Sequence, residues 1–244
     1  MKTLGPSLLA LAACFVAASA QADGCPVMDG APGLARAGTE ERLAYLAKAF
    51  DREVFEVDAW SWTWGSIYTA GVAAESIALG ITTNHGTRTD LTVGVISTAF
   101  GAVSLYGLPL KLTLPLRAAR RHWNDPDPCA VLARAERTLV NVEANQALAN
   151  GIVAHLGNVA ANAAIALILG IGYGRWTSAA ISAGVGLTVG ETNAFTQPHH
   201  LSEVLARYRS GRLDGPDAPP LSVSWAITPV VTRQMSGAAL VLHW

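Results

Sequence analysis

The sequence predicts a mainly α protein with two helical hairpins, each preceded by an amphipathic helix, and a small C-terminal β-hairpin. Three patterns lead to this prediction. Four long apolar runs occur as two pairs, an amphipathic segment precedes each pair, and the last residues alternate between apolar and polar. Only 14% of the 244 residues are charged and 51% are hydrophobic, whereas an average soluble domain carries roughly 25% charged residues. We therefore expect a four-helix transmembrane or membrane-associated bundle.

The charge balance excludes two other classes of protein. The chain has 17 basic and 18 acidic residues. A nucleic-acid-binding domain would show a clear basic excess, and a disordered chain would combine few hydrophobic residues with a high net charge. We therefore expect a folded protein without a nucleic-acid partner.

Residues 1–22 have the pattern of a cleaved secretory signal peptide. Lys2 precedes an apolar run, and small residues then allow cleavage after Ala20 or Ala22. The apolar run is far shorter than the roughly 20 residues that a membrane-spanning helix needs. We therefore expect export and cleavage. The residues around Cys14 also resemble a lipoprotein processing site, so lipidation of Cys14 is the alternative.

Cleavage would remove Cys14 and leave Cys25 and Cys129 as the remaining cysteines. Two cysteines in an oxidising compartment predict a disulfide, and two unrelated thiols are the alternative. Their spacing does not match a redox pair or a zinc knuckle.

The helical domain is expected to cover residues 39–213, after an irregular lead-in at 23–38. Thr39 is a suitable N-cap, and apolar residues then recur every three or four positions up to Val57, which indicates an amphipathic helix. Asp127 and Pro128 predict the start of the second amphipathic helix. The apolar runs cover residues 59–87, 91–110, 151–174 and 176–190.

The C-terminal part changes its periodicity. Residues 214–220 are rich in proline and aspartate and are expected to form a linker. Beyond it, in residues 221–244, apolar and polar residues alternate in two stretches, which predicts a β-hairpin. This hairpin could dock on the helical domain or on another envelope protein.

Two of the apolar runs are strong candidates for membrane insertion. Residues 91–110 contain nine Leu, Ile, Val or Phe residues and no charge, which favours insertion by roughly 4 kcal/mol. The run at 151–174 also has nine such residues, but it carries polar side chains. The other two runs are marginal alone. Stripes of small residues could allow them to pack closely; these are Gly94, Ser97, Gly101 and Ser104, and Ser178, Ser182, Gly186 and Gly190.

The distribution of basic residues opposes a simple inner-membrane protein. If the signal is cleaved and all four runs span, the short inside connections hold only Arg88 and Arg175. The positive-inside rule would predict the reverse orientation. A periplasmic or outer-membrane-associated bundle therefore stays open as the alternative.

The candidate site consists of polar residues within the apolar runs, because such groups require partners and often mark sites. They are Glu75, His155, Asn158, Asn162 and Glu191. His155, Asn158 and Asn162 share one helix face. Either Glu75 or Glu191 exchanges a proton or ion with His155, or these groups form interhelical hydrogen bonds that fix the packing, which we favour.

Several short motifs resemble those of an uncharacterised group of exported bacterial proteins with four apolar helices. The motifs are Trp60-Ser61-Trp62-Thr63-Trp64, His155-Leu156-Gly157-Asn158, Gly190-Glu191 and Thr196-Gln197-Pro198. The resemblance covers roughly residues 40–213. It implies the same architecture, and it implies no activity because none is assigned to that group.

The sequence therefore favours an exported cell-envelope membrane protein with a structural or interaction role and its long polar segments on the periplasmic side. A periplasmic bundle that binds a lipid or another apolar ligand is the alternative, and a carrier that uses Glu75 and His155 is the third hypothesis. The familiar nucleotide, hydrolase and metalloprotease motifs are absent from the sequence. We expect no enzyme activity, no cofactor and no metal, and the lipid bilayer is the expected partner.

Overall fold

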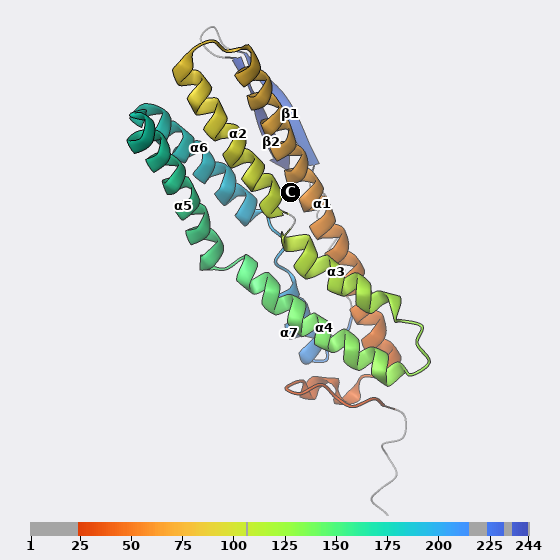
Figure 1. Cartoon of the computed structure of the whole chain (residues 1–244). Coiled ribbons are helices and arrows are strands. Elements are labelled where there is room, and N and C mark those ends of the chain that lie inside the picture. The colour runs from red at the N-terminus through yellow and green to blue at the C-terminus, as the bar shows by residue number, and fades with distance from the viewer. Residues whose placement is uncertain (1–23, 106, 215–223, 232–235, 244) are drawn as a thin grey trace, which may run out of the picture. The chain divides into compact units, whose positions relative to one another are not determined.

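The computed structural model describes residues 24–105, 107–214, 224–231 and 236–243, and it divides into two units at Asp214. The first unit is helical, so the mainly α prediction is confirmed (Figure 1). The predicted signal peptide and most of the predicted linker lie outside the described residues.

In chain order, the described helices of the first unit are the 3₁₀ helix η1 (Pro32–Arg36), α1 (Thr39–Ile81), α2 (His85–Leu105), α3 (Gly107–Arg121), α4 (Pro128–Ala149), α5 (Ile152–Leu167), the π-helix η2 (Ile168–Gly172), α6 (Trp176–Phe195) and α7 (Leu201–Arg209).

Helix α1 is one continuous helix of 43 residues. The sequence predicted two separate elements here, an amphipathic helix and the apolar run at 59–87, and this division is wrong. No proline interrupts the segment, and the helix ends only at Ile81. Asn84 then accepts a hydrogen bond from the Thr87 amide at 3.0 Å and starts α2. Residues 82–87 of the predicted run therefore belong to the connection and to α2.

The predicted run at 91–110 is helical throughout its described residues, in α2 up to Leu105 and in α3 from Gly107, and Tyr106 lies outside the described residues. The start of α4 agrees with the prediction. Asp127 accepts hydrogen bonds from the amides of Cys129 and Ala130, and Pro128 occupies the first helical position.

We call residues 24–60, 107–150 and 196–213 the base. Here the apolar faces of α1, α3, α4 and α7 enclose a core. Its fully buried large residues include Leu46, Phe50, Leu112, Leu116, Leu132, Leu139, Leu201 and Tyr208. This is the ordinary arrangement of a water-soluble helical domain, with apolar stripes turned inward.

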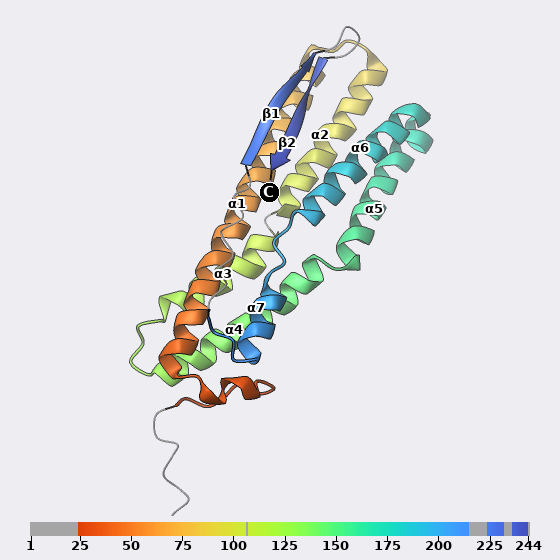
Figure 2. The same ribbon diagram turned by 180° about the vertical axis from the view of Figure 1, so that it is seen from behind.

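Two helical hairpins extend from the base (Figures 1 and 2). Hairpin 1 consists of residues 61–81 of α1 and of α2, and hairpin 2 consists of α5, η2 and α6. Within each hairpin the two antiparallel arms pack along each other. The ends of the hairpins that lie far from the base are called the tips.

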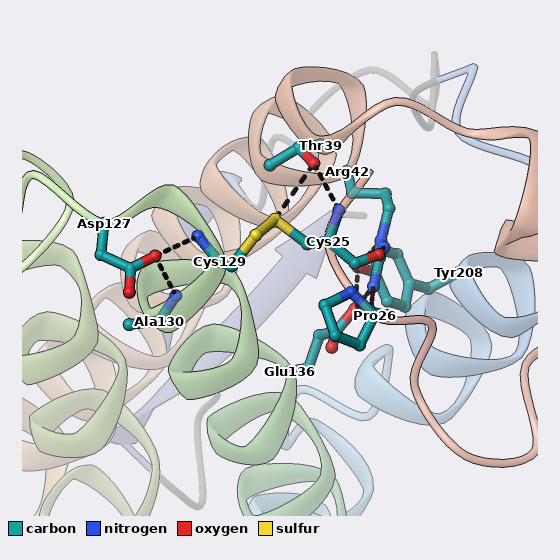
Figure 3. Close-up of a disulfide and its surroundings, with 9 residues drawn as sticks. All are labelled: Cys25, Pro26, Thr39, Arg42, Asp127, Cys129, Ala130, Glu136 and Tyr208. Carbon is teal, nitrogen blue, oxygen red and sulfur yellow. Dashed lines mark hydrogen bonds and ion pairs between the residues drawn. A yellow bond between two sulfur atoms is a disulfide. The ribbon is translucent and has the colours of Figure 1, made fainter. Parts of the chain in front are cut away.

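A disulfide joins Cys25 to Cys129, as predicted, and attaches the lead-in to the start of α4 (Figure 3). The guanidinium group of Arg42 lies beside it and is 1% exposed. It donates to the carbonyl oxygens of Cys25 and Pro26 and forms an ion pair with Glu136. The lead-in is therefore held by a covalent bond and by buried hydrogen bonds.

The second unit contains two strands, β1 (Ser224–Val231) and β2 (Ser236–His243). They pair antiparallel, with Ser224 opposite His243 and Val231 opposite Ser236. The residues between the two strands lie outside the described part of the chain.

Candidate functional site

The hairpins carry their large apolar side chains on the outside. Examples are Ile77 on α1, Phe100 on α2, Ile152 on α5 and Val185 on α6, all exposed. Among the described side chains, α2 buries Leu105 and α6 buries Ala179. This arrangement is the reverse of the base, where the apolar residues are turned inward.

Two helical stretches are long and apolar enough to cross a membrane by length and composition. They are His85–Arg121 and Pro128–Gly172, with mean hydropathies of 1.6 and 1.9 in their apolar windows. Only 6% and 11% of these windows is buried. The core helix of a soluble protein would be mostly buried, so these stretches do not have the burial of a core helix.

The predicted polar residues of hairpin 2 come together between α5 and α6. His155 Nδ1 lies 2.6 Å from Glu191 Oε2, and Asn158 Nδ2 donates to Glu191 Oε1 at 2.8 Å. Asn162 Nδ2 donates to both oxygens of Asn158, at 2.8 and 2.9 Å. We call these four residues the polar ladder. Each of them has a hydrogen-bond partner within it.

Two glycines of the predicted small stripe make room for the ladder. A Cβ atom at Gly186 would overlap Asn162 Oδ1, and a Cβ atom at Gly190 would overlap Asn158 Oδ1. The stripe on α6 therefore faces α5, and the close approach of the two backbones allows the asparagine side chains to lie between them.

Glu75 does not join this ladder. It lies between α1 and α2, where a Cβ atom at Gly94 would be 2.8 Å from Glu75 Oε1. Its Oε2 atom is buried without a hydrogen-bond partner. Of the two predicted partners of His155, the structure thus pairs Glu191 with it, and among the described residues no hydrogen bond or ion pair connects Glu75 with His155.

A buried acidic residue of the base was not predicted. Glu53 of α1 is 3% exposed, and Gln146 Nε2 donates to its Oε1 atom at 2.5 Å. Burial raises the pKa of Glu53 to about 7, and the nearby carboxylate of Glu56 raises it further. The hydrogen bond from Gln146 and the charge of Arg52 oppose this shift. In the sequence Glu53 looks like any surface acid of an amphipathic helix.

A second unpredicted feature joins the two hairpins near their tips. Arg175 forms an ion pair with Asp90, and Ser178 donates to the same carboxylate. Opposite charges near the ends of two apolar runs were the only signal of this pair in the sequence.

The described residues contain no group of three or more His, Cys, Asp or Glu side chains that could hold a metal ion. No family model, no curated protein and no solved structure matches this chain. The geometry of the hairpins is therefore what points to a function.

Proposed function

We propose that the protein is an exported cell-envelope membrane protein with a structural or interaction role, whose two hairpins lie in the lipid bilayer. The observation that carries the proposal is the outward direction of large apolar side chains on all arms of the hairpins. Exposed apolar surface of this extent is unfavourable in water and marks contact with a partner or a membrane. Lipid chains would cover it without any further protein.

The lengths of the hairpin arms support this proposal. Helix α6 has 20 residues, which correspond to about 30 Å at a rise of about 1.5 Å per residue. The hydrocarbon core of a bilayer is about 30 Å thick. Exposed aromatic residues also lie near both ends, with Trp62 beside the base and Tyr173 and Trp176 near the tip of hairpin 2. Aromatic rings of this kind favour the membrane interface.

The disulfide supports placing the base on the periplasmic side. Cys25–Cys129 would persist in an oxidising compartment and would be reduced in the cytosol. The abundance of arginines in the base favours the opposite side. We give more weight to the disulfide because it is a covalent tie to the core, whereas many arginines of the base, such as Arg120 with Asp51, are paired with carboxylates.

An interaction role is proposed for the parts outside the bilayer. The described residues of the second unit form one pair of strands, and an isolated two-stranded sheet is at best marginally stable in water. Another envelope protein that adds a strand would stabilise it. The proposed place in the envelope also agrees with the resemblance to exported bacterial proteins.

The test combines fractionation with thiol labelling. Carbonate-washed membranes should retain the protein. In a Cys14→Ser background, Thr83→Cys places a thiol at the tip of hairpin 1, and Asn141→Cys places one on the exposed face of α4 in the base. An impermeant maleimide should reach the base thiol from the periplasm and the tip thiol only after the membrane is opened.

Two results would contradict the proposal. Recovery in the soluble periplasmic fraction without detergent would favour the alternative, a periplasmic bundle that binds a lipid or another apolar ligand. Equal labelling of both thiols from one side would show that the hairpins do not cross the membrane.

A further inference from the structure

The tips of the two hairpins are joined by one compact polar cluster. Arg175 Nε donates to Asp90 Oδ1 at 2.6 Å, and Arg175 Nη2 donates to Asp90 Oδ2. Ser178 Oγ also donates to Asp90 Oδ2, at 2.9 Å. Bidentate pairs of this kind fix the geometry as well as the distance between two groups. Asp90 belongs to hairpin 1, and Arg175 and Ser178 belong to hairpin 2.

The backbone on both sides is shaped around this cluster. The guanidinium group of Arg175 lies directly against Gly86, where a Cβ atom would overlap Nη1. The Arg175 amide donates to the carbonyl oxygen of Leu169 at 2.9 Å. Gly174, immediately before it, has a φ of +67°, which glycine adopts readily. The turn before α6 thus fixes the backbone of Arg175, and the absence of a side chain at Gly86 leaves space for its guanidinium group.

Little other packing between the hairpins is available to hold the tips together. The small residues that allow close helix contact are used inside the hairpins, because Gly94 and Gly101 face Glu75 and Tyr68 of α1, and Gly186 and Gly190 face α5. The buried residues of α2 and α6 are Leu105, at the base end of α2, and Ala179, beside the cluster. No other described side chain of α2 or of α6 is buried.

The two hairpins are also attached to the base in different ways. Hairpin 1 continues the base through the unbroken helix α1. Hairpin 2 is connected through the break at Asn150 and Gly151 and through residues 196–200, where helical structure is interrupted. Short irregular connections are the places where backbone angles can change while helices stay rigid. Trp60 and Trp64 donate to Thr196 Oγ1 in the second connection, which ties this end of hairpin 2 to α1 and leaves the tip as the end that could swing.

We propose that Asp90, Arg175 and Ser178 form a latch that closes the tips of the two hairpins. When the latch opens, hairpin 2 swings away as a unit about its connections to the base, and each hairpin keeps its own packing. Opening separates α2 from α6 and exposes their facing surfaces to lipid or to a partner helix. The side chains of Arg175 and Asp90 are 33% and 26% exposed, so polar groups from outside can reach them and compete for the ion pair.

Spin-label distances in the full, disulfide-bonded chain in detergent test the latch directly. In the Cys14→Ser background, labels at Thr83→Cys and Tyr173→Cys report the distance between the tips. Labels at Ile77→Cys and Ile96→Cys, both at exposed positions, report the distance within hairpin 1. Asp90→Asn and Arg175→Gln should each lengthen and broaden the tip distance and leave the distance within hairpin 1 unchanged.

A matched control removes an ion pair of the same type from the base. Asp51→Asn breaks the bidentate pair with Arg120 and should leave the tip distance as in the parent. The exchange Asp90→Arg with Arg175→Asp should shift the tip distance back towards the parent value. The latch would be overturned if Asp90→Asn and Arg175→Gln left the distance between the tips unchanged. It would also be overturned if these variants changed the distance within hairpin 1 as much as the distance between the tips. Neither result depends on whether the hairpins span a membrane.

Discussion

Gln146 links three parts of the base through one side chain. Its Oε1 atom accepts a hydrogen bond from the Leu201 amide at 2.9 Å, which fixes the orientation of its amide group, and its Nε2 atom therefore faces Glu53. Helices α1, α4 and α7 are thus joined by two consecutive buried hydrogen bonds, and the last acceptor is the carboxyl group of Glu53. These hydrogen bonds stabilise the fold most when the carboxyl group is neutral, because burial penalises a charge.

Glu53 should make the stability of the protein depend on pH. Its pKa is about 7 in the folded protein against an ordinary value of 4.5. A carboxyl group with a raised pKa binds its proton more tightly in the folded state, so its contribution is complete below pH 4.5 and is lost as the pH rises to about 7. At about 1.4 kcal/mol per pH unit, the loss is on the order of 3 kcal/mol.

Replacing Glu53 by Gln should remove this dependence. The Gln side chain can still accept from Gln146 and carries no charge, so the free energy of unfolding at pH 8 should rise by up to about 3 kcal/mol. Denaturant unfolding at pH 5, 6, 7 and 8 measures it, with Glu41→Gln, at an exposed position of the same helix, as a control. A variant whose pH profile follows that of the parent would contradict the assigned pKa.

The polar ladder gives a second prediction at the scale of residues. Asn158→Ala removes two hydrogen bonds from α5 to α6, those from Asn158 Nδ2 to Glu191 Oε1 and to the Leu187 carbonyl oxygen. Hydrogen bonds between membrane helices contribute about 0.6 kcal/mol each on average, so stability in detergent should fall by roughly 1 kcal/mol. Thermal unfolding measures the change, and Val159→Ala on the outer face of α5 is the control. If His155→Ala, Asn158→Ala and Asn162→Ala all leave the melting temperature unchanged, the polar ladder does not stabilise the packing of α5 against α6.

At the scale of elements, the sequence predicted which segments are helical better than where the helices begin and end. Asp127 with Pro128 marked the start of α4 correctly, because a cap is a local signal. The continuity of α1 was missed, since the change from amphipathic to uniformly apolar residues near Ala59 suggested a boundary. The change in composition marks the point where α1 leaves the core of the base, and the helical backbone continues through it.

The small stripe on α6 yields a prediction about the packing of an element. Gly186→Ala should push against Asn162 and force it to break its hydrogen bonds, with a loss of about 1–3 kcal/mol, as is usual for an overpacked site. Gly184→Ala is the matched control on the same helix, because a Cβ atom there meets nothing within 4 Å. It should be neutral or slightly stabilising. Equal effects of both variants on thermal unfolding in detergent would mean that α5 and α6 do not approach as described.

The candidate site could be predicted only in part, because some of its residues share one helix whereas others lie far apart in the sequence. His155, Asn158 and Asn162 were placed on one face because their spacing is helical. The choice of Glu191 over Glu75 depends on which helices become neighbours, which spacing does not encode. Likewise, Arg175 and Asp90 are 85 residues apart, and each looks like an ordinary end-of-helix charge until the hairpins are brought together.

At the scale of the whole molecule, the disulfide constrains a large part of the chain. It closes a loop of 104 residues, for which the chain-entropy model gives a stabilisation of about 4–5 kcal/mol. The double variant Cys25→Ser and Cys129→Ser should lower the denaturant midpoint accordingly. The buried hydrogen bonds of Arg42 should still hold the lead-in, so protease cleavage within residues 24–38 should increase only modestly. Alkylation of both thiols in the exported protein without reductant would show that the disulfide does not form there.

The unbroken helix α1 also fixes a rotational relation between the base and hairpin 1. Each added residue turns the rest of an α-helix by about 100°. One alanine inserted after Ala59 would therefore rotate Glu75 away from Gly94 and turn the outward, apolar side of the helix towards α2, although every side chain of the base would keep its place. Seven inserted residues would restore the angle to within about 20°. The register of hairpin 1 is thus set by the length of a segment of the chain that lies outside it.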